Sequence, residues 1–457
     1  MFPTHIFKAY DIRGLNDEIS PELARALGRA YVEFLRAKKV DLGGRKIVVG
    51  RDMRTNSPAL AAAVIQGITE SGVDVVEIGL CTTPLFNFSV ANFAQHAAGI
   101  MITASHNPGQ YNGFKMTLSD GLPVGKNSGM DVVRDLTENM LTAPTENKAK
   151  AGSVANFDPL PSYLEKVLSL VPAGSIKPLK VVVDAGNGMA KATIPALLAK
   201  LPIHAEYLFL EPDGNFPNHE ANPLKVETLK TLQAKVLEMG ADFGFALDGD
   251  ADRIGLVDEK GEVVEASFVG ALAGLEVLKL HPGAKMLFDL RSSQIVPEVW
   301  QAAGGHADKC VVGHALIKKQ MREVDAVYAS ELSLHLYYGD LYDLESPELS
   351  LLLFARLLSS TNKKLSALTS PLKKYFHSGE INFKVVDPAA VMARLEDEYK
   401  KYSTEITHLD GLWMGFDWGW FNARASNTEP VLRLNLEANT RAVMEEKLHE
   451  VRGMIKE

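Results

Sequence analysis

The chain has 457 residues, of which 46% are hydrophobic and 23% charged, a composition typical of a globular protein and not of a disordered chain. At roughly 150 residues per domain this length predicts about three domains, and four units of about 110 residues would fit as well. Acidic residues (57) outnumber basic ones (48), which gives a net charge of −9. This charge argues against nucleic acid or an anionic membrane as a partner.

The two cysteines, Cys81 and Cys310, lie far apart, each in an apolar strand-like run. They are expected to be buried thiols in a reducing compartment, not a disulfide. Near the start, Lys8, Asp11 and Arg13 interrupt the apolar stretch that a signal peptide needs, and no later run approaches about 18 apolar residues. We therefore expect a cytoplasmic protein with no membrane segment.

Short β-branched runs alternate with longer segments of helical period along most of the chain, which predicts βαβ units and mostly parallel sheets. The expected strands are 45–50, 73–78, 98–102, a run from Lys180, 205–210, 243–247, 285–290, 308–312 and 326–329. A helix is expected at 58–69. Another is expected to start at Asn222 as N-cap and to stop before Gly240.

The last 90 or so residues differ, because residues 431–437 alternate apolar and polar side chains and precede a closing helix from about Arg441. An aromatic cluster here is expected to be core and not a sugar platform; it comprises Trp413, Phe416, Trp418, Phe421 and Trp420. The expected fold is α/β, with three similar α/β domains of mixed, mostly parallel sheets and a smaller C-terminal α+β domain. The expected domain ranges are 1–150, 151–257, 258–368 and 369–457.

The segment TASHNP, residues 103–108, directly follows the expected strand 98–102. The carboxyl end of a parallel strand is where α/β sheets bind ligands, and Ser105 offers a hydroxyl nucleophile there, beside His106. The alternative is a plain turn that ends a strand. A Ser-His-Asp hydrolase is disfavoured, because adjacent side chains rarely meet as nucleophile and base and the chain has no G-x-S-x-G motif.

The segment DGDADR follows another strand and places Asp248, Asp250 and Asp252 at alternate positions. Three carboxylates so close repel one another unless a cation binds, and their oxygens suit Mg²⁺. An EF-hand is excluded because Arg253 occupies the sixth position, where glycine is required. The alternative is an exposed acidic turn.

Two later loops carry polar groups suited to a sugar phosphate. In RASNTEP, Arg424 can bind phosphate with a guanidinium fork, helped by nearby hydroxyl, amide and N–H groups. In SELSLH, Glu331, Ser333 and His335 are good partners for vicinal sugar hydroxyls. Taken alone, the first segment could be a surface turn, and His335 could be a core histidine.

Together these four loops closely resemble the α-D-phosphohexomutase family, in the family's order. TASHNP resembles its phosphoserine loop, DGDADR its metal loop, SELSLH its sugar-recognition loop and RASNTEP its phosphate-binding loop. The segments KAYDIRG, GRDMR, NGFK, FDLRSS and GHALIKK extend the resemblance over the whole chain. Within the family it is most similar to the phosphomannomutase and bifunctional phosphomannomutase/phosphoglucomutase branch, since Asn427 stands where phosphoglucosamine mutases usually have glycine.

The resemblance implies four domains around a central cleft and a phosphorylated Ser105, which would be a ligand of Mg²⁺ together with Asp248, Asp250 and Asp252. The enzyme would interconvert hexose 6-phosphate and hexose 1-phosphate, of mannose or glucose, through a hexose 1,6-bisphosphate. Lys115 and His335 would move protons. Charge would be stabilised by Arg13, Arg253, Arg291 and His314. The remaining substrate contacts would come from Tyr10, Glu331, Ser333, Arg424, Ser426, Asn427 and Thr428, and Tyr10 and His106 would also position the phosphoserine loop.

The chain departs from the family pattern in the sugar loop, where Ser330 replaces glycine and Leu334 a small residue, and where 338–350 lack the usual signature. Mannose or glucose preference, the general base, oligomeric state and pathway are left open. A Mg²⁺-dependent sugar phosphatase that uses Ser105 and a non-catalytic sugar-phosphate binder remain as alternatives. Ala251, in place of glycine in the metal loop, is expected to leave the metal ligands intact.

Overall fold

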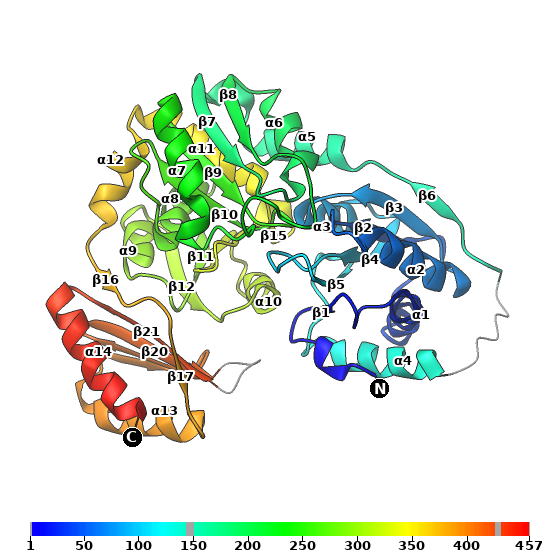
Figure 1. The fold of residues 1–457 in the computed structure, drawn as a ribbon. Helices are drawn as coiled ribbons and strands as arrows, with labels where there is room; N and C mark the ends of the chain where they lie inside the picture. The colour runs from blue at the N-terminus through cyan, green and yellow to red at the C-terminus, as the bar shows by residue number, and fades with distance from the viewer. Residues whose placement is uncertain (1, 143–149, 426–430, 457) are drawn as a thin grey trace. The chain divides into compact units, whose positions relative to one another are not determined.

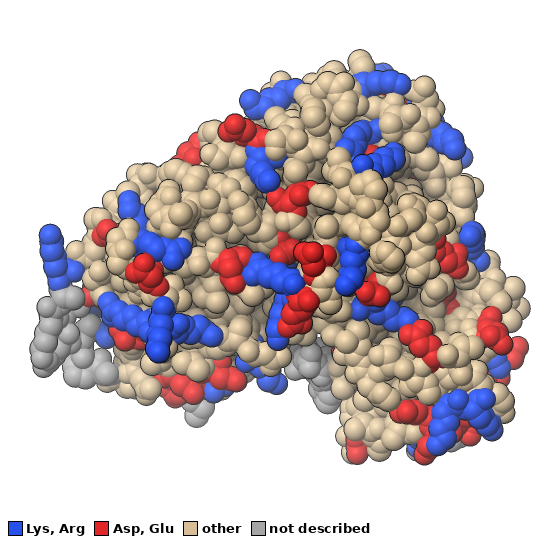
Figure 2. Space-filling model, turned by 180° about the vertical axis from the view of Figure 1, so that it is seen from behind, with Lys and Arg blue, Asp and Glu red and all other residues tan. Residues whose placement is uncertain are grey.

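The computed structural model describes residues 2–142, 150–425 and 431–456 (Figure 1). Two compact units can be distinguished, Met1–Val264 with Ser333–Ser366, and Glu265–Leu332 with Ala367–Glu457. Over the face presented in Figure 2, Lys and Arg side chains are interspersed with Asp and Glu. In the described ranges, no helix is both long and apolar enough to span a bilayer.

The first sheet of unit 1 has six strands in the order β1-β5-β4-β2-β3-β6. β5 is antiparallel to both of its neighbours, β1 and β4, and the β4–β2, β2–β3 and β3–β6 pairs are parallel. Its strands are β1 (Ile12–Leu15), β2 (Lys46–Arg51), β3 (Val75–Leu80), β4 (His96–Ile102), β5 (Tyr111–Leu118) and β6 (Val154–Asn156). Its helices are α1 (Pro21–Ala37), α2 (Ser57–Glu70), α3 (Thr83–Asn92) and α4 (Met130–Thr142). The apolar residues of α1, α2 and the sheet form one buried core, in which Leu27, Val64 and Ile100 are 1%, 0% and 0% exposed.

The second sheet of unit 1 has the order β10-β9-β7-β8, and only β10 is antiparallel to its neighbour. Its strands are β7 (Leu179–Asp184), β8 (Ile203–Leu208), β9 (Phe243–Leu247) and β10 (Ile254–Asp258), and its helices are α5 (Leu160–Leu170), α6 (Ile194–Leu198) and α7 (Lys230–Met239). Unit 1 also contains the antiparallel pair β14 (Leu336–Tyr338) and β15 (Leu344–Glu345), and α11 (Pro347–Thr361). Short 3-10 helices occur in both units, at Thr4–Ile6, Ala173–Ser175, Met189–Ala192, Val226–Leu229, Gly339–Leu341, Ser370–Leu372 and Lys400–Tyr402.

The helix expected from Asn222 begins later than predicted. The Asn222 side chain accepts a hydrogen bond from the N–H of Leu224 at 3.2 Å, a local turn that competes with helix capping. The chain then makes a 3-10 turn, and α7 starts only at Lys230. Its predicted end is confirmed, since Gly240 terminates the helix in the left-handed region, at φ +57°.

Unit 2 begins with α8 (Ala266–Leu280) and three parallel strands, β11 (Lys285–Asp289), β12 (His306–Cys310) and β13 (Tyr328–Ser330). The helices α9 (Ile295–Ala302) and α10 (His314–Val324) connect these strands, and α12 (Leu365–Thr369) follows later in the chain. β12 lies two residues before the expected strand 308–312. The other predicted strands overlap the observed ones.

The C-terminal part of unit 2 is an antiparallel sheet in the order β16-β21-β20-β19-β18, with β17 beside β21. The strands are β16 (Phe376–His377), β17 (Ile381–Lys384), β18 (Glu405–Thr407), β19 (Leu412–Phe416), β20 (Gly419–Ala425) and β21 (Val431–Ala438). The helices α13 (Pro388–Tyr399) and α14 (Arg441–Lys456) pack on it. The three α/β sheets with their helices and the antiparallel C-terminal domain confirm the predicted fold class.

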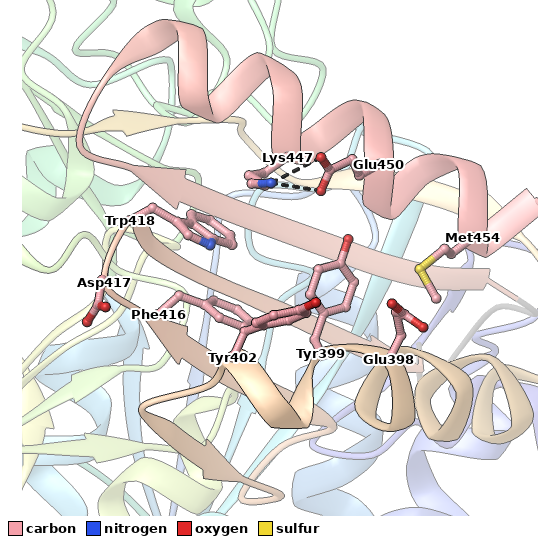
Figure 3. A pocket seen from close by; sticks show the side chains of 9 residues that line it. All are labelled: Glu398, Tyr399, Tyr402, Phe416, Asp417, Trp418, Lys447, Glu450 and Met454. Atoms are coloured by element: carbon pink, nitrogen blue, oxygen red, sulfur yellow. Dashed lines mark hydrogen bonds and ion pairs between the residues drawn. The ribbon is translucent and has the colours of Figure 1, made fainter.

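The aromatic cluster of the C-terminal domain is largely core, as expected. Trp413 and Trp420 stack on each other and pack with Leu290, and Phe421 is fully buried. Trp418 departs from the expectation, because it is half-buried and lines a groove of about 1000 Å³ that also includes residues of α13 and α14 (Figure 3).

Candidate active site

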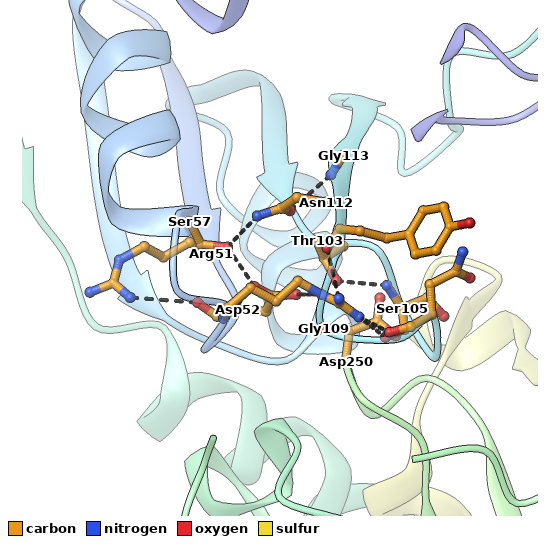
Figure 4. Close-up of polar contacts among 12 residues, drawn as sticks. Arg51, Asp52, Ser57, Thr103, Ser105, Gly109, Asn112, Gly113 and Asp250 are labelled. Atoms are coloured by element: carbon orange, nitrogen blue, oxygen red, sulfur yellow. Dashed lines mark hydrogen bonds and ion pairs between the residues drawn. The ribbon is translucent and has the colours of Figure 1, made fainter. Parts of the chain in front are cut away.

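Ser105 lies in the loop that follows β4, and its side chain is directed at the acidic residues of unit 1 (Figure 4). Its backbone is left-handed, at φ +53°, a conformation that costs a residue with a side chain about 1–2 kcal/mol. Its Oγ lies 3.1 Å from Asp248 Oδ2 and 3.2 Å from His106 Nδ1. Because the backbone turns at Ser105, the side chains of Ser105 and His106 are in contact. The expectation that adjacent serine and histidine side chains rarely meet does not hold at this position.

The loop between β9 and β10 carries the three aspartates and touches the Ser105 loop through Gly249. A Cβ at Gly249 would lie 2.4 Å from the Ser105 carbonyl oxygen, so only glycine allows this approach. Ala251, two residues on, adopts φ +57°. The three carboxylates remain within 4.8 Å of one another, so Ala251 is compatible with a metal site.

Each of the aspartates Asp248, Asp250 and Asp252, hereafter the acidic cluster, has at least one oxygen held by the protein. Asp248 Oδ1 accepts the N–H of Asp252 at 3.0 Å. Lys115 Nζ, from β5, donates to Asp250 Oδ2 at 2.6 Å and to Asp252 Oδ2 at 2.8 Å. Within the described residues, the buried Oδ1 of Asp250 accepts no hydrogen bond, and the only group near Oδ1 of Asp252 is the His335 imidazole, at 3.3 Å.

The electrostatics of the acidic cluster point to a cation. Burial, followed by the charges of Asp252 and Asp250, raises the pKa of Asp248 to about 8. Burial lowers the pKa of Lys115, but Asp250 and Asp252 outweigh it and hold that pKa above its usual value. Even with a charged Lys115, the three carboxylates remain close together and Asp250 Oδ1 lacks a donor, so the cluster fits Mg²⁺, which prefers hard oxygen ligands.

His335 is 7% exposed and lies beside the acidic cluster, not in an apolar core. Its Nδ1 is 2.8 Å from Ser333 Oγ, and its Nε2 is 3.3 Å from both Arg253 Nε and Asp252 Oδ1. The intervening Leu334 adopts φ +70°, and its carbonyl accepts the N–H of Ile254 at 3.2 Å. This main-chain hydrogen bond connects the segment 330–335 to the start of β10.

Arg13 and His106 flank the Ser105 loop. Arg13, on β1, donates to Asn107 Oδ1 at 2.8 Å and pairs with Asp11. Burial, and then the charges of Arg253 and Arg13, lower the pKa of His106 to about 2, so its imidazole is neutral at physiological pH. Tyr10 is half-buried and lies three residues before Arg13.

In unit 2, three expected site residues follow the carboxyl ends of parallel strands. Arg291 follows β11, His314 begins α10 after β12, and Glu331 follows β13. Glu331 Oε1 accepts the N–H of Gly313 at 3.2 Å and lies 3.5 Å from Arg291 Nη2. The strand ends thus bring together motifs that are separate in the sequence.

Ser330 is not positioned as a sugar ligand. It is 3% exposed, and a Cβ at Gly270 of α8 would lie 2.7 Å from the Cβ of Ser330. The absent side chain at Gly270 makes room for Ser330. The side chain of Ser330 therefore packs against α8.

Arg424, at the end of β20, belongs to a second charged group, which we call the arginine cluster: Arg291, Arg424 and Arg433 around Glu380. Arg424 Nη2 and Arg291 Nη1 lie 3.2 Å and 3.5 Å from Glu380 Oε2, and Arg433 Nη1 lies 3.2 Å from Oε1. Burial raises the pKa of Glu380, but the three guanidinium groups outweigh it and lower that pKa. Ser426, Asn427 and Thr428 lie outside the described residues.

Sequence reasoning missed two residues of these clusters, Thr83 and Glu380. Thr83 donates to Asp250 Oδ2 at 2.6 Å, and its N–H donates to the Asp250 carbonyl at 2.9 Å. The Thr-Thr-Pro sequence signals a helix start, which Thr82 caps, but not this second contact. No local pattern marks Glu380, because its partners come from distant strands.

Family models match nearly the whole chain. The models of phosphoglucomutase/phosphomannomutase α/β/α domains I, II and III match residues 4–142, 161–261 and 266–375, and the model of the C-terminal domain matches residues 380–454.

Similar proteins agree with these matches. A phosphohexose mutase of Xanthomonas campestris is 39% identical over 453 residues, which cover 98% of this chain and 99% of that protein. A phosphomannomutase of Salmonella typhimurium is 39% identical over 440 residues, 94% of each chain. The crystal structure of a phosphoglucomutase/phosphomannomutase family protein from Burkholderia thailandensis superposes with a TM-score of 0.88 at 31% identity, covering 100% of this chain and 98% of the other. The chain therefore belongs to the α-D-phosphohexomutase family, the phosphoglucomutase/phosphomannomutase enzymes, which are isomerases.

Proposed function

We propose that the chain interconverts hexose 6-phosphate and hexose 1-phosphate, with mannose, glucose or both as the sugar, through a phosphorylated Ser105 and a hexose 1,6-bisphosphate. The observation that carries the proposal is the buried Ser105 Oγ, 3.1 Å from Asp248 Oδ2 at the edge of the acidic cluster. A hydroxyl held there can carry a phosphoryl group next to a divalent cation. The names of the phosphohexose mutase and phosphomannomutase relatives support the substrate class.

In the first half-reaction, the bond between phosphorus and Ser105 Oγ breaks and a bond from phosphorus to the oxygen of the free sugar hydroxyl forms. The hydroxyl proton passes to a side-chain proton carrier, and the released Ser105 Oγ takes up a proton. The bisphosphate then turns over, and its other phosphoryl group returns to Ser105 Oγ. Asp248, Asp250, Asp252 and the phosphate on Ser105 would hold Mg²⁺. The bound ion would neutralise charge on the transferring group, an effect worth several kcal/mol.

Proton transfer and charge stabilisation are assigned to residues that surround Ser105 in unit 1. Lys115 and His335 are the proposed proton carriers at the sugar hydroxyl, since both lie within 3.3 Å of acidic-cluster oxygens. Arg13 and Arg253 would stabilise negative charge on the phosphoryl group. The neutral His106 would orient Ser105 Oγ and would not act as an acid.

Substrate binding is assigned to the loops that carry polar groups but no nucleophile. Arg424 would bind the non-reacting phosphate in either orientation of the sugar. Ser426, Asn427 and Thr428 are proposed to complete that phosphate site. Glu331 and Ser333 would bind the 3- and 4-hydroxyls, with Tyr10, Arg291, His314 and His335 as further contacts.

A coupled assay tests the proposal. Mannose 1-phosphate and glucose 1-phosphate are offered separately with Mg²⁺, with and without a trace of glucose 1,6-bisphosphate. We expect formation of the 6-phosphate and stimulation by the bisphosphate, with no matching release of inorganic phosphate. Mass spectrometry of the purified protein should locate an acid-stable phosphate on Ser105. Stoichiometric phosphate release would instead support a phosphatase, and absence of turnover with both sugars would refute the proposal.

A further inference from the structure

Arg54 is a buried arginine whose five N–H groups all have acceptors. Its side chain is 0% exposed. Nε donates to Asp52 Oδ2 at 3.1 Å, and the terminal nitrogens donate to the carbonyl oxygens of Ser105 (2.9 Å), Asn107 (2.6 Å), Pro108 (2.8 Å) and Tyr111 (2.8 Å). Four carbonyl groups of one seven-residue stretch, which contains the nucleophile, thus converge on a single guanidinium group.

The residues around Arg54 keep its guanidinium group in place. The ring of Phe216 lies against it, with 5.3 Å between the guanidinium carbon and the ring centroid. The chain also passes close by at Gly214, where a Cβ would lie 2.6 Å from the Arg54 Cα. The loop from the second sheet is therefore packed over Arg54, which prevents water from replacing its hydrogen bonds.

Arg54 is also connected to regular structure in the first domain, through Asp52, Ser57 and Asn112, which are labelled in Figure 4. Asp52 Oδ1, just after β2, accepts the Arg54 N–H at 3.0 Å and the Ser57 hydroxyl at 2.6 Å. Asn112 donates to Ser57 Oγ at 3.0 Å. The start of α2 and the start of β5 are thus tied to the same carboxylate, which orients Arg54.

We propose that Arg54 is the positioning residue of the phosphoserine loop: by binding four of its carbonyl oxygens, it maintains the left-handed backbone at Ser105 and sets the distance from Ser105 Oγ to Asp248. This inference rests on the proposed role of Ser105 as the phosphoryl carrier. Arg54 does not itself bind the sugar or the transferred group in this proposal. Lysine cannot replace it, because an ammonium group has three N–H donors where the loop and Asp52 use five.

The inference predicts an effect on turnover rather than on binding. In Arg54→Lys we expect kcat to fall at least about a hundredfold, because a displacement of about 1 Å at a reacting atom has effects of that size. The KM for glucose 1-phosphate should change less than about threefold, because Arg54 contacts none of the residues that are proposed to bind the substrate. Phosphorylation of Ser105 by added glucose 1,6-bisphosphate, followed by mass spectrometry, should slow in parallel with kcat.

The matched control is Arg51→Lys. Arg51 precedes Asp52 and makes one contact with it, a 3.5 Å hydrogen bond to its carbonyl oxygen. This variant should keep kcat and KM. Asp52→Asn leaves the guanidinium group in place but weakens its orientation, and it should show an intermediate loss of kcat.

Hydrogen exchange of the wild-type protein tests the inference even if Arg54→Lys does not fold. The amides of Asn107 and Tyr111 donate to loop carbonyls at 3.1 Å and 3.0 Å. If Arg54 holds the loop, they should exchange as slowly as the amides of α2. Rapid exchange in the wild type, or a folded Arg54→Lys with unchanged kcat, would overturn the inference. A wild-type protein without phosphate on Ser105, or an active Ser105→Ala, would instead refute the proposed function on which it rests.

Discussion

The acidic cluster of unit 1 and the arginine cluster of unit 2 both contain buried charged side chains with incomplete internal compensation, but of opposite sign. In the acidic cluster, Asp250 Oδ1 accepts no hydrogen bond from a described residue, and Asp252 Oδ1 has only the His335 imidazole, at 3.3 Å. In the arginine cluster, Arg424 Nε is a hydrogen-bond donor that has no acceptor among the described residues. Because a buried unpaired group is costly, each cluster is suited to a ligand of opposite charge, a metal cation in one and a phosphate in the other.

The two clusters also differ in how the chain holds them. The acidic cluster lies on a short turn whose backbone touches Ser105 and whose oxygens are fixed by Thr83 and Lys115. The arginines reach Glu380 on long side chains from strands and strand ends. The difference matches the proposed chemistry, since a reacting phosphoryl group needs an accurate position whereas a non-reacting phosphate needs only to be held.

The largest effect should come from the nucleophile beside the acidic cluster. Ser105→Ala removes the proposed phosphoryl carrier, so the mutase rate should fall about a thousandfold or more. The coupled assay with added glucose 1,6-bisphosphate measures it. Ser89→Ala is the control, because Ser89 is buried in α3 and its Oγ has no hydrogen-bond partner in the described structure. A Ser105→Ala enzyme with near wild-type turnover would show that the acidic cluster serves another reaction.

Asp250→Asn tests whether the acidic cluster is a cation site. Loss of one carboxylate charge should weaken Mg²⁺ or Mn²⁺ binding, measured by calorimetry, by at least about a hundredfold. Asp258→Asn is a matched control. Asp258 is also buried, and its described side-chain hydrogen bonds come from main-chain N–H groups. If Asp250→Asn keeps the wild-type metal affinity, the acidic cluster is not the cation site, and the proposed difference between the two clusters is wrong.

Arg424→Ala tests the arginine cluster. Loss of charged hydrogen bonds to a phosphate should raise the KM for sugar phosphate about tenfold to a hundredfold, with a smaller change in kcat. The exposed Arg452 of α14 provides the control substitution, Arg452→Ala. If KM does not change in Arg424→Ala, the phosphate site must be elsewhere.

A smaller effect concerns Glu437, a buried carboxylate of the domain that carries Arg424. Glu437 Oε1 accepts the N–H of Gln294 at 2.8 Å and Trp420 Nε1–H at 3.0 Å, and burial raises its pKa to about 7. The unfolded chain releases this proton near pH 4.3, so the stabilising contribution is complete below that pH and is lost as pH rises through about 7. The free energy of unfolding should fall by at most about 4 kcal/mol over this window.

Urea denaturation at pH 5 and pH 8 measures this dependence. Glu437→Gln should reduce it, because glutamine keeps an acceptor but does not titrate. An equal pH dependence in wild type and Glu437→Gln would show that burial of Glu437 has no effect on stability between these pH values.

Local patterns were enough to single out some of the candidate loops. Ser105, the three aspartates and Glu331 were chosen because they follow expected strands, at whose carboxyl ends α/β sheets bind ligands, whereas Arg291 was suggested only by the family resemblance. The contacts of Thr83, Arg54 and Glu380 could not be predicted in this way, because they join residues far apart in the chain. Thr83 and Asp250, for example, are 167 residues apart.

Backbone conformation was the other source of error. The positive φ of Ser105 allows its contact with His106, and the turn at Asn222 delays the start of α7. Both depend on competition between local hydrogen bonds and tertiary packing, which residue preferences alone do not resolve.

The close approach at Gly249 has a mechanical consequence. The first two sheets are locked together at the point where the nucleophile meets the carboxylates, because the Ser105 carbonyl occupies the space that a side chain would fill. Under the proposed function, a movement that opened this contact would also separate the phosphate on Ser105 from the acidic cluster. We therefore expect the bisphosphate to change its orientation by rotation of the sugar and not by opening of this junction.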